Sequence, residues 1–159
     1  MERLLSQIKT LYEKKNYEHA LECGYEYLNQ RSNDVEVMRL VSQILESLGR
    51  VNEAINMITN VLEISDVKEP CDFFARGRWL LKLSKISDAI EDFESILCIS
   101  NEIGDHYYTD TTRIFLTYAL AKMMRYEEAK VQLALLEDDF IIYVNKNRVD
   151  RKYLEQILA

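Results

Sequence analysis

Glycine and proline are scarce in this chain of 159 residues, which contains four glycines and one proline. Barrels and sandwiches need turn residues at short intervals, and nucleotide-binding loops need clustered glycines. Neither kind of structure can be built from this composition. The three cysteines, Cys23, Cys71 and Cys98, form no CxxC pair, which predicts reduced thiols and a cytoplasmic protein.

Long hydrophobic runs are also missing. No segment approaches the roughly 18 apolar residues of a membrane helix, and the first residues lack the apolar core of a secretory signal. The formal net charge of −7 argues against a general binder of nucleic acid or anionic membranes. We therefore expect neither nucleic acid nor a membrane as a partner.

Residue patterns of catalytic and metal sites are absent from the sequence. His19 and His106 have no second histidine at helical spacing, and no HExxH, GxSxG or Walker pattern occurs. Cys71 lies next to Asp72, as a reactive thiol could, but nothing nearby in the sequence supplies a base, so we expect its thiol to pack rather than react. The sequence therefore predicts no enzyme, no metal site and no cofactor.

A repeated segment organises what the chain does contain. Each copy has a polar residue, an apolar residue, two polar residues and an alanine, and the alanines are spaced 34, 35 and 40 residues apart. Apolar residues recur at spacings of three and four on both sides, which is typical of amphipathic helices. The four alanines are Ala20, Ala54, Ala89 and Ala129. The sequence thus predicts four helix–turn–helix units.

The units and a final helix account for the whole chain. A stack of such units needs a terminal helix with a wetter outer face. We expect the units at residues 1–34, 35–69, 70–109 and 110–149, and the capping helix at 150–158. In the third unit, Gly104 is expected to end a longer second helix in the left-handed conformation.

This organisation resembles the tetratricopeptide repeat (TPR), a unit of about 34 residues with an A-x3-F signature in its second helix. Ala89 and Phe93 match that signature, and Gly77 with Leu80 partly matches the first helix. Tyr27 is large at a site where the family often has alanine. The resemblance implies an all-α, right-handed superhelical solenoid in one domain, with first helices along a concave groove and second helices facing outward.

Charge is divided between the two helices of each unit. With first helices at 2–15, 36–48, 72–85 and 111–125, their formal charges total +7. With second helices at 17–30, 52–65, 86–100 and 126–139, the total is −13. If the chain stacks as the family does, an acidic protein would carry a net positive groove. Glu91 and Asp92 are expected to lie exposed on the outer helices.

Helical phase places aromatic residues beside cations on the predicted groove face. Such a face suits an extended or helical peptide that carries acids and one or two apolar anchors. The alternative is that the aromatic residues pack between repeats and the cations are solvated. The predicted partner-binding residues are Lys9, Tyr12, Arg39, Gln43, Phe74, Arg78, Lys82, Tyr118 and Lys122.

The function predicted from the sequence is that of a non-enzymatic module that binds a segment of another protein in its groove. The alternative is a dedicated chaperone or immunity-type inhibitor that masks one cognate protein. Some chaperone-binding members of the family hold a terminal carboxylate in a basic clamp. Only Lys9 is basic among the matching positions of this chain, so that clamp is absent.

Overall fold

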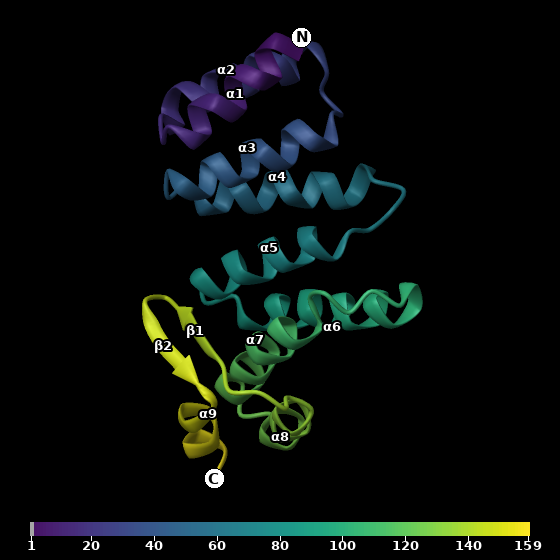
Figure 1. Ribbon diagram of the computed structural model, residues 1–159, viewed down its shortest axis with the longest axis vertical. Coiled ribbons are helices and arrows are strands. Elements are labelled where there is room, and N and C mark those ends of the chain that lie inside the picture. The colour runs from purple at the N-terminus through teal and green to yellow at the C-terminus, as the bar shows by residue number, and fades with distance from the viewer. Residues whose placement is uncertain (1) are drawn as a thin grey trace. The chain divides into compact units, whose positions relative to one another are not determined.

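The computed structural model describes residues 2–159, which form nine helices and one two-stranded hairpin. The elements are α1 (Glu2–Glu13), α2 (Tyr17–Gln30), α3 (Val35–Ser47), α4 (Val51–Ile64), α5 (Pro70–Lys82), α6 (Ile86–Ile103), α7 (Thr109–Lys122), α8 (Tyr126–Ala134), β1 (Ile141–Val144), β2 (Asn147–Asp150) and α9 (Arg151–Leu158). They divide into two compact units (Figure 1): α1–α4, ending at Lys68, and Glu69–Ala159, which holds the rest.

Each unit is built from two helical pairs. In the first unit α1 packs against α2, α3 packs against α4, and α2 joins the two pairs by packing against α3. In the second unit the pairs are α5–α6 and α7–α8, joined by α6 against α7. These are the helix–turn–helix repeats that the sequence predicts. No helix of the described residues is long and apolar enough to span a membrane.

Small residues lie where the two helices of a pair meet. All four repeat alanines have an exposed fraction of 0%. A Cβ atom built on Gly77 would come within 2.8 Å of the Phe93 ring, so α5 and α6 approach closely at this glycine. A larger side chain at such a crossing would force the helix axes beyond their usual separation of about 8–10 Å.

The same turn joins the helices of all four pairs. Its central residue has a positive φ, and the next N–H donates to the carbonyl five residues earlier, as from Asn16 to Leu11 and from Arg125 to Leu120, both at 2.9 Å. This hydrogen-bond pattern satisfies the last carbonyls of the first helix. The central residues are Lys15, Gly49, Ser84 and Met124. They repeat the spacing of the alanines, although only Gly49 of the four suits a positive φ.

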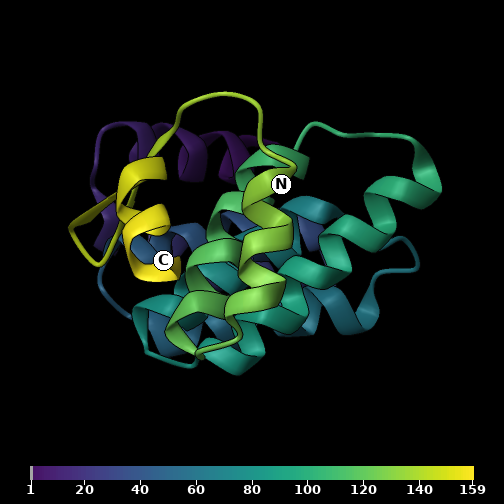
Figure 2. The same ribbon diagram turned by 90° about the horizontal axis from the view of Figure 1, so that it is seen from below.

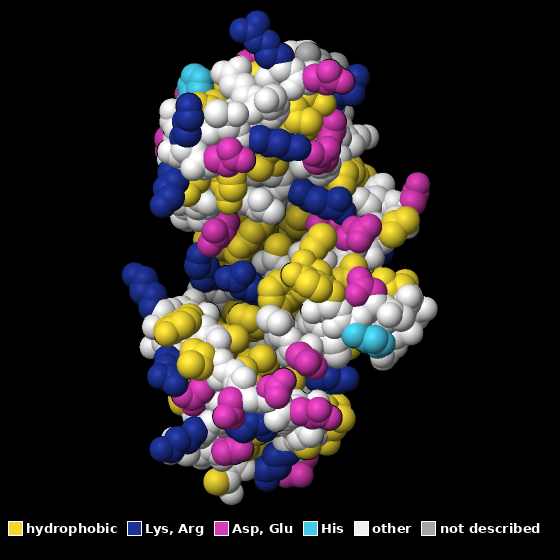
Figure 3. Space-filling view, viewed as in Figure 1, with side chains coloured by type: hydrophobic (Ala, Val, Ile, Leu, Met, Phe, Trp, Pro, Cys, Tyr) yellow, Lys and Arg dark blue, Asp and Glu magenta, His cyan; other side chains and the backbone are white. Residues whose placement is uncertain are grey.

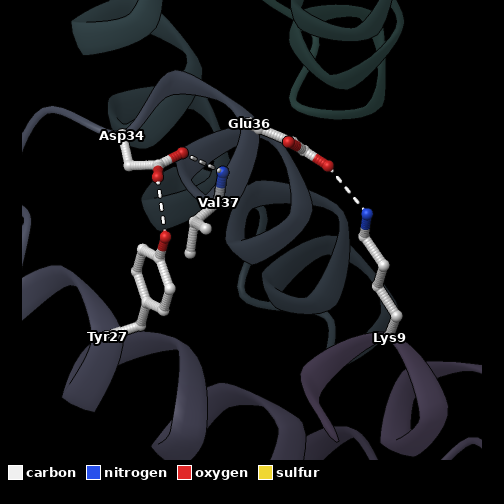
Figure 4. Close-up of polar contacts among 5 residues, drawn as sticks. All are labelled: Lys9, Tyr27, Asp34, Glu36 and Val37. Atoms are coloured by element: carbon white, nitrogen blue, oxygen red, sulfur yellow. Dashed lines mark hydrogen bonds and ion pairs between the residues drawn. The ribbon is translucent and has the colours of Figure 1, made fainter. Parts of the chain in front are cut away.

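Tyr27 is accommodated by a hydrogen bond between two helical pairs of the first unit (Figure 4). Its hydroxyl donates to Asp34 Oδ2 at 2.9 Å, and Asp34 Oδ1 accepts from the Val37 N–H at 3.2 Å as the N-cap of α3. The hydrogen bond to Asp34 raises the pKa of the Tyr27 phenol, and burial adds to this rise. A large side chain therefore replaces the small residue typical of the family because its polar end has a partner.

The C-terminal part of the fourth repeat differs from the prediction. Helix α8 ends at Ala134 rather than near 139, and β1 and β2 pair antiparallel with Ile142 opposite Val149. The run Ile141–Val144 favours a strand, and the turn residues Asn145 and Lys146 both have a positive φ, as a tight hairpin turn requires. The final helix, α9, lies where the sequence predicts one. Gly104 ends α6 with a φ of 70°, which confirms that prediction.

Replacing Ala54 or Ala89 by leucine should destabilise the chain by about 1–3 kcal/mol, because each substitution overpacks a helix crossing. Ala134 is exposed on α8, so Ala134→Leu is the matched control and should change the free energy of unfolding by less than about 0.5 kcal/mol. Denaturant unfolding measures both. Buried-site variants as stable as the parent would contradict the close approach of the helices.

Replacing Met124 by glycine should stabilise the chain by about 0.5–1 kcal/mol, because a β-carbon disfavours the left-handed backbone at this position. Met124 has a φ of 58° and an exposed fraction of 76%, so little packing is lost. Gly49 has a φ of 76°, and Gly49→Ala should destabilise to a similar extent. The midpoints of thermal unfolding should therefore move in opposite directions.

Candidate functional site

The predicted partner-binding residues divide between the two units. Helices α1 and α3 of the first unit carry Lys9, Tyr12, Arg39 and Gln43. Helices α5 and α7 of the second unit carry Phe74, Arg78, Lys82, Tyr118 and Lys122.

In the first unit, Lys9 is the cation predicted on α1 to bind a partner, and it already forms an ion pair within the chain. Lys9 Nζ lies 2.7 Å from Glu36 Oε1, and this ion pair joins α1 to α3 (Figure 4). The ring centroid of Tyr12 lies 5.6 Å from that of Tyr17, so Tyr12 packs partly against α2. Arg39 is half-buried and Gln43 is exposed. Glu36 belongs to this surface and was not anticipated from the sequence.

The charge of the first helices is smaller than the sequence predicts. Within the observed helix bounds, α1, α3, α5 and α7 carry a total of +2, and α2, α4, α6 and α8 a total of −11. The difference of five charges arises because Lys14, Lys15, Lys85 and Arg125 lie in the turns and because α7 also includes Asp110. Helices α1 and α3 together carry −1, whereas α5 and α7 carry +3. A net positive charge on the first helices is therefore found only in the second unit.

Phe74 is the centre of an aromatic cluster in the second unit. Its ring centroid lies 5.4 Å from that of Tyr108, 5.5 Å from that of Phe115 and 6.3 Å from that of Phe93. These rings join α5 to α6, to α7 and to the residue before α7. Phe74 is half-buried, so it contributes to packing whatever else it contacts.

Arg78 covers this cluster from the exposed side. Its guanidinium carbon lies 5.9 Å from the ring centroids of both Phe74 and Phe115, within the range of a cation–π interaction. Lys82, one helical turn further along α5, is also exposed. The arrangement joins aromatic surface to positive charge, as predicted, although the aromatic rings mainly pack against one another.

The part of the predicted surface on α7 is largely covered by the chain itself. Lys122 Nζ lies 5.4 Å above the Tyr118 ring, and burial raises the pKa of the Tyr118 phenol while Lys122 lowers it. Ile114 and Ala121, which lie at helical spacing from Tyr118 on α7, have exposed fractions of only 7% and 6%. Helix α9 packs against both α7 and α8 (Figures 1 and 2). The C-terminal segment thus occupies a face that the repeat pattern predicts to be open.

The tip of the hairpin reaches α5. Asn145 Nδ2 donates to the Leu81 carbonyl at 3.4 Å, which brings Lys146 into the neighbourhood of Lys82. In the space-filling view, Lys and Arg side chains gather over the carboxyl end of α5 and the hairpin (Figure 3). Lys146 and Arg148 therefore extend the basic surface. Neither Lys146 nor Arg148 was predicted from the sequence, because residues 110–149 were expected to form a helical repeat.

Asp92 is not exposed, contrary to the prediction. Its exposed fraction is 3%, and its carboxylate accepts from Arg76 Nε at 2.9 Å and from Arg76 Nη2 at 2.7 Å. Burial raises the pKa of the Asp92 carboxyl, and Arg76 opposes that rise. Asp92 follows Ala89 by three residues, so both lie on the side of α6 that faces α5. Glu91 is exposed as predicted.

The cysteines and acidic residues form no metal site in the described range. Residues 2–159 contain no group of three or more His, Cys, Asp or Glu side chains arranged to hold a metal ion. Cys23, Cys71 and Cys98 form no disulfide within the described residues; Cys23 is buried, whereas Cys71 and Cys98 are exposed. Cys71 is exposed, so the expectation that its thiol packs was wrong: it lies in the first turn of α5, and its Sγ lies 3.8 Å from Asp72 Oδ1.

Comparison with known proteins agrees with this architecture. No protein-family model matches the chain. A TPR repeat-containing protein of Methanocaldococcus jannaschii is 30% identical over 82 residues, which cover 49% of this chain and 26% of that protein. The solved structure of MamA from Desulfovibrio magneticus RS-1 has a TM-score of 0.74 at 16% identity, covering 84% of this chain and 71% of that one.

A second solved structure carries the repeat in its description. YrrB, a TPR protein with an unusual peptide-binding site, has a TM-score of 0.70 at 18% identity, covering 82% of this chain and 64% of that one. The chain has the tetratricopeptide-repeat fold. The resemblance and the fold class predicted from the sequence are confirmed. Within this TPR fold, α1, α3, α5 and α7 are the first helices of the repeats.

Replacing Asp92 by alanine should destabilise the TPR fold by about 3 kcal/mol, because it leaves the largely buried Arg76 without its bidentate partner. Glu91→Ala, one residue away on the exposed face of α6, is the control and should change stability by less than about 0.5 kcal/mol. Chemical denaturation distinguishes the two variants. Equal stability of both would mean that the Arg76–Asp92 pair contributes nothing to joining α5 and α6.

Proposed function

We propose that this chain is a non-enzymatic module that binds an acidic segment of another protein. In the second unit the binding surface would consist of Phe74, Arg78 and Lys82 on α5 with Tyr118 and Lys122 on α7. In the first unit Lys9, Tyr12, Arg39 and Gln43 would contribute contacts of their own. The TPR fold supports the general role, because structurally similar proteins include YrrB, whose description names a peptide-binding site.

The observation that carries this proposal is a pair of exposed cations in a protein of net charge −7. Within residues 2–159, Arg78 and Lys122 form no ion pair with a carboxylate, and both lie above aromatic rings. A carboxylate brought by a partner would find these cations without a competing internal acid. Charges of this kind steer association and make its rate depend on salt, since screening acts within about 8 Å at physiological ionic strength.

The remaining elements of the proposal follow from the composition. Three cysteines that form no disulfide within residues 2–159 are compatible with a reducing compartment, so we place the protein in the cytoplasm. The net negative charge disfavours nucleic acid and anionic membranes as partners. A dedicated chaperone or immunity-type inhibitor would use the same surface to mask a single cognate protein. A quantitative pull-down would reveal whether one protein or several are captured.

Reversing the charge of Arg78 and Lys82 together, as Arg78→Glu and Lys82→Glu, should slow association with the captured partner by about tenfold or more. The effect should diminish as salt is raised, because it acts through exposed charges. Surface plasmon resonance with the purified partner measures the association rate, and a thermal melt near that of the parent confirms that the fold is retained.

The matched control reverses two exposed acids of the outer helix α6, as Glu91→Lys and Glu102→Lys. Asp92 is unsuitable for this purpose because it is buried. The control should bind as the parent does. Loss of binding in the control, together with full binding by the Arg78 and Lys82 variant, would place the partner on the opposite face and overturn the proposal.

A further inference from the structure

The hairpin of the second unit has two faces of different character. Because Ile142 pairs with Val149 and Tyr143 with Arg148, alternate residues point to opposite faces. Val144 and Val149 are buried, with exposed fractions of 5% and 1%. On the other face, Ile141 and Tyr143 have exposed fractions of 55% and 65%. Two large apolar side chains of a strand that has only four residues are thus exposed to solvent.

A depression lies at the base of this exposed face. Its volume is about 470 Å³. The residues that line it are Asp139, Phe140, Ile141, Arg148, Asp150, Arg151 and Lys152. Phe140 and Ile141 supply apolar surface, and the guanidinium carbon of Arg151 lies 5.7 Å from the Phe140 ring centroid. The depression therefore offers an apolar floor beside basic side chains, which suits an apolar side chain with acidic neighbours.

The charges around the depression and the hairpin are mainly positive. Arg148 and Arg151 face the acids Asp150 and Asp139, at 3.1 and 3.6 Å. Lys146 at the tip and Lys152 at the base form no ion pair within residues 2–159. Lys82 on α5 continues this basic surface beyond the tip, where Asn145 contacts the Leu81 carbonyl. Basic side chains thus lie beside the exposed apolar side chains from the tip of the hairpin to its base.

We infer that the outer face of the hairpin is a docking surface for an extended, acidic segment of a partner protein that carries an apolar anchor residue. The anchor enters the depression beside Ile141 and Phe140, and Tyr143 packs on the segment between base and tip. Acidic residues of the segment face Lys152 at one end and Lys146 with Lys82 at the other. This inference rests on the proposed function and adds the hairpin to its binding surface.

The exposed surface of the hairpin suits a protein segment better than a nucleic acid. Ile141 and the aliphatic part of the depression suit an aliphatic or aromatic side chain, whereas a nucleic acid would need a longer basic track along its phosphates. The whole chain is acidic, which disfavours a polyanion. A single-stranded oligonucleotide therefore serves as a competing probe in the test.

The test measures binding of the full chain to short synthetic peptides by fluorescence anisotropy. The first probe has one phenylalanine flanked on both sides by aspartate and glutamate. The second replaces that phenylalanine by alanine, the third replaces the acids by lysine, and the fourth is oligothymidine. We expect the first probe to bind about tenfold or more tightly than each of the others. Equal binding of the alanine probe, tighter binding of oligothymidine, or no binding of the first probe would overturn the inference.

Two kinds of variant locate the probe on the hairpin. Ile141→Thr with Tyr143→Thr removes the apolar side chains while keeping residues that favour strands, and should weaken binding about tenfold. Lys152→Glu alters only the charge at the rim of the depression and should also weaken binding. The control is Ile103→Thr with Tyr107→Thr, which changes side chains that are 60% and 81% exposed away from the hairpin, and it should bind as the parent does.

The same assay separates this inference from the proposed function. Arg78→Glu alone is the α5 variant in this comparison, because Lys82 belongs to both surfaces. If it abolishes binding and the hairpin variants do not, the surface on α5 is the binding site and the inference about the hairpin is wrong. If the hairpin variants lose binding and the α5 variant does not, the inference holds and the proposed surface on α5 is wrong. Loss of binding in both supports one continuous surface.

Discussion

The close approach of two helices at one alanine in each pair is the constraint on which the rest of the structure depends. Each alanine is completely buried, and Gly77 meets the Phe93 ring at a similar crossing. Because the helices of a pair touch there, the turn before the second helix must be short, and it takes the same left-handed form in all four pairs. Lysine, serine and methionine adopt that backbone conformation in three of them, so packing outweighs the local preference for glycine.

The C-terminal segment changes what the repeat can offer to a partner. A first helix such as α7 would normally keep one face open, yet Ile114 and Ala121 are buried and α9 packs on the helix. In the second unit, the part of the predicted binding face that stays exposed is therefore made by α5 and by Lys122 of α7, and the outer face of the hairpin adds to it. The two units also differ in the charge of their first helices: α5 and α7 carry a net +3, whereas α1 and α3 carry −1.

Features that depend on helical period could be predicted from the sequence. The alanine spacing and the apolar residues three and four apart predicted the four helical pairs, and Gly104 correctly marked the end of α6. The hairpin was missed because Ile141–Val144 is short, and its Asn145-Lys146 turn lacks the glycine that usually signals such a turn. Asp92 was misassigned because acidic residues are usually exposed, whereas this one is buried against Arg76 from another helix. Contacts between helices, such as the ion pair of Lys9 with Glu36, could not be predicted, because the spacing of apolar residues within one helix does not show which side chains of another helix it meets.

In the proposed binding mode, the second unit holds an acidic partner segment through α5, Lys122 of α7 and the outer face of the hairpin. Hydrogen-exchange mass spectrometry of the chain with and without its captured partner tests this claim most directly. We expect slower exchange of backbone amides in Pro70–Lys82 and Ile141–Asp150 when the partner is bound, with α2 and α4 unchanged. Slower exchange confined to the outer helices α6 and α8, with α5 and the hairpin unaffected, would contradict it.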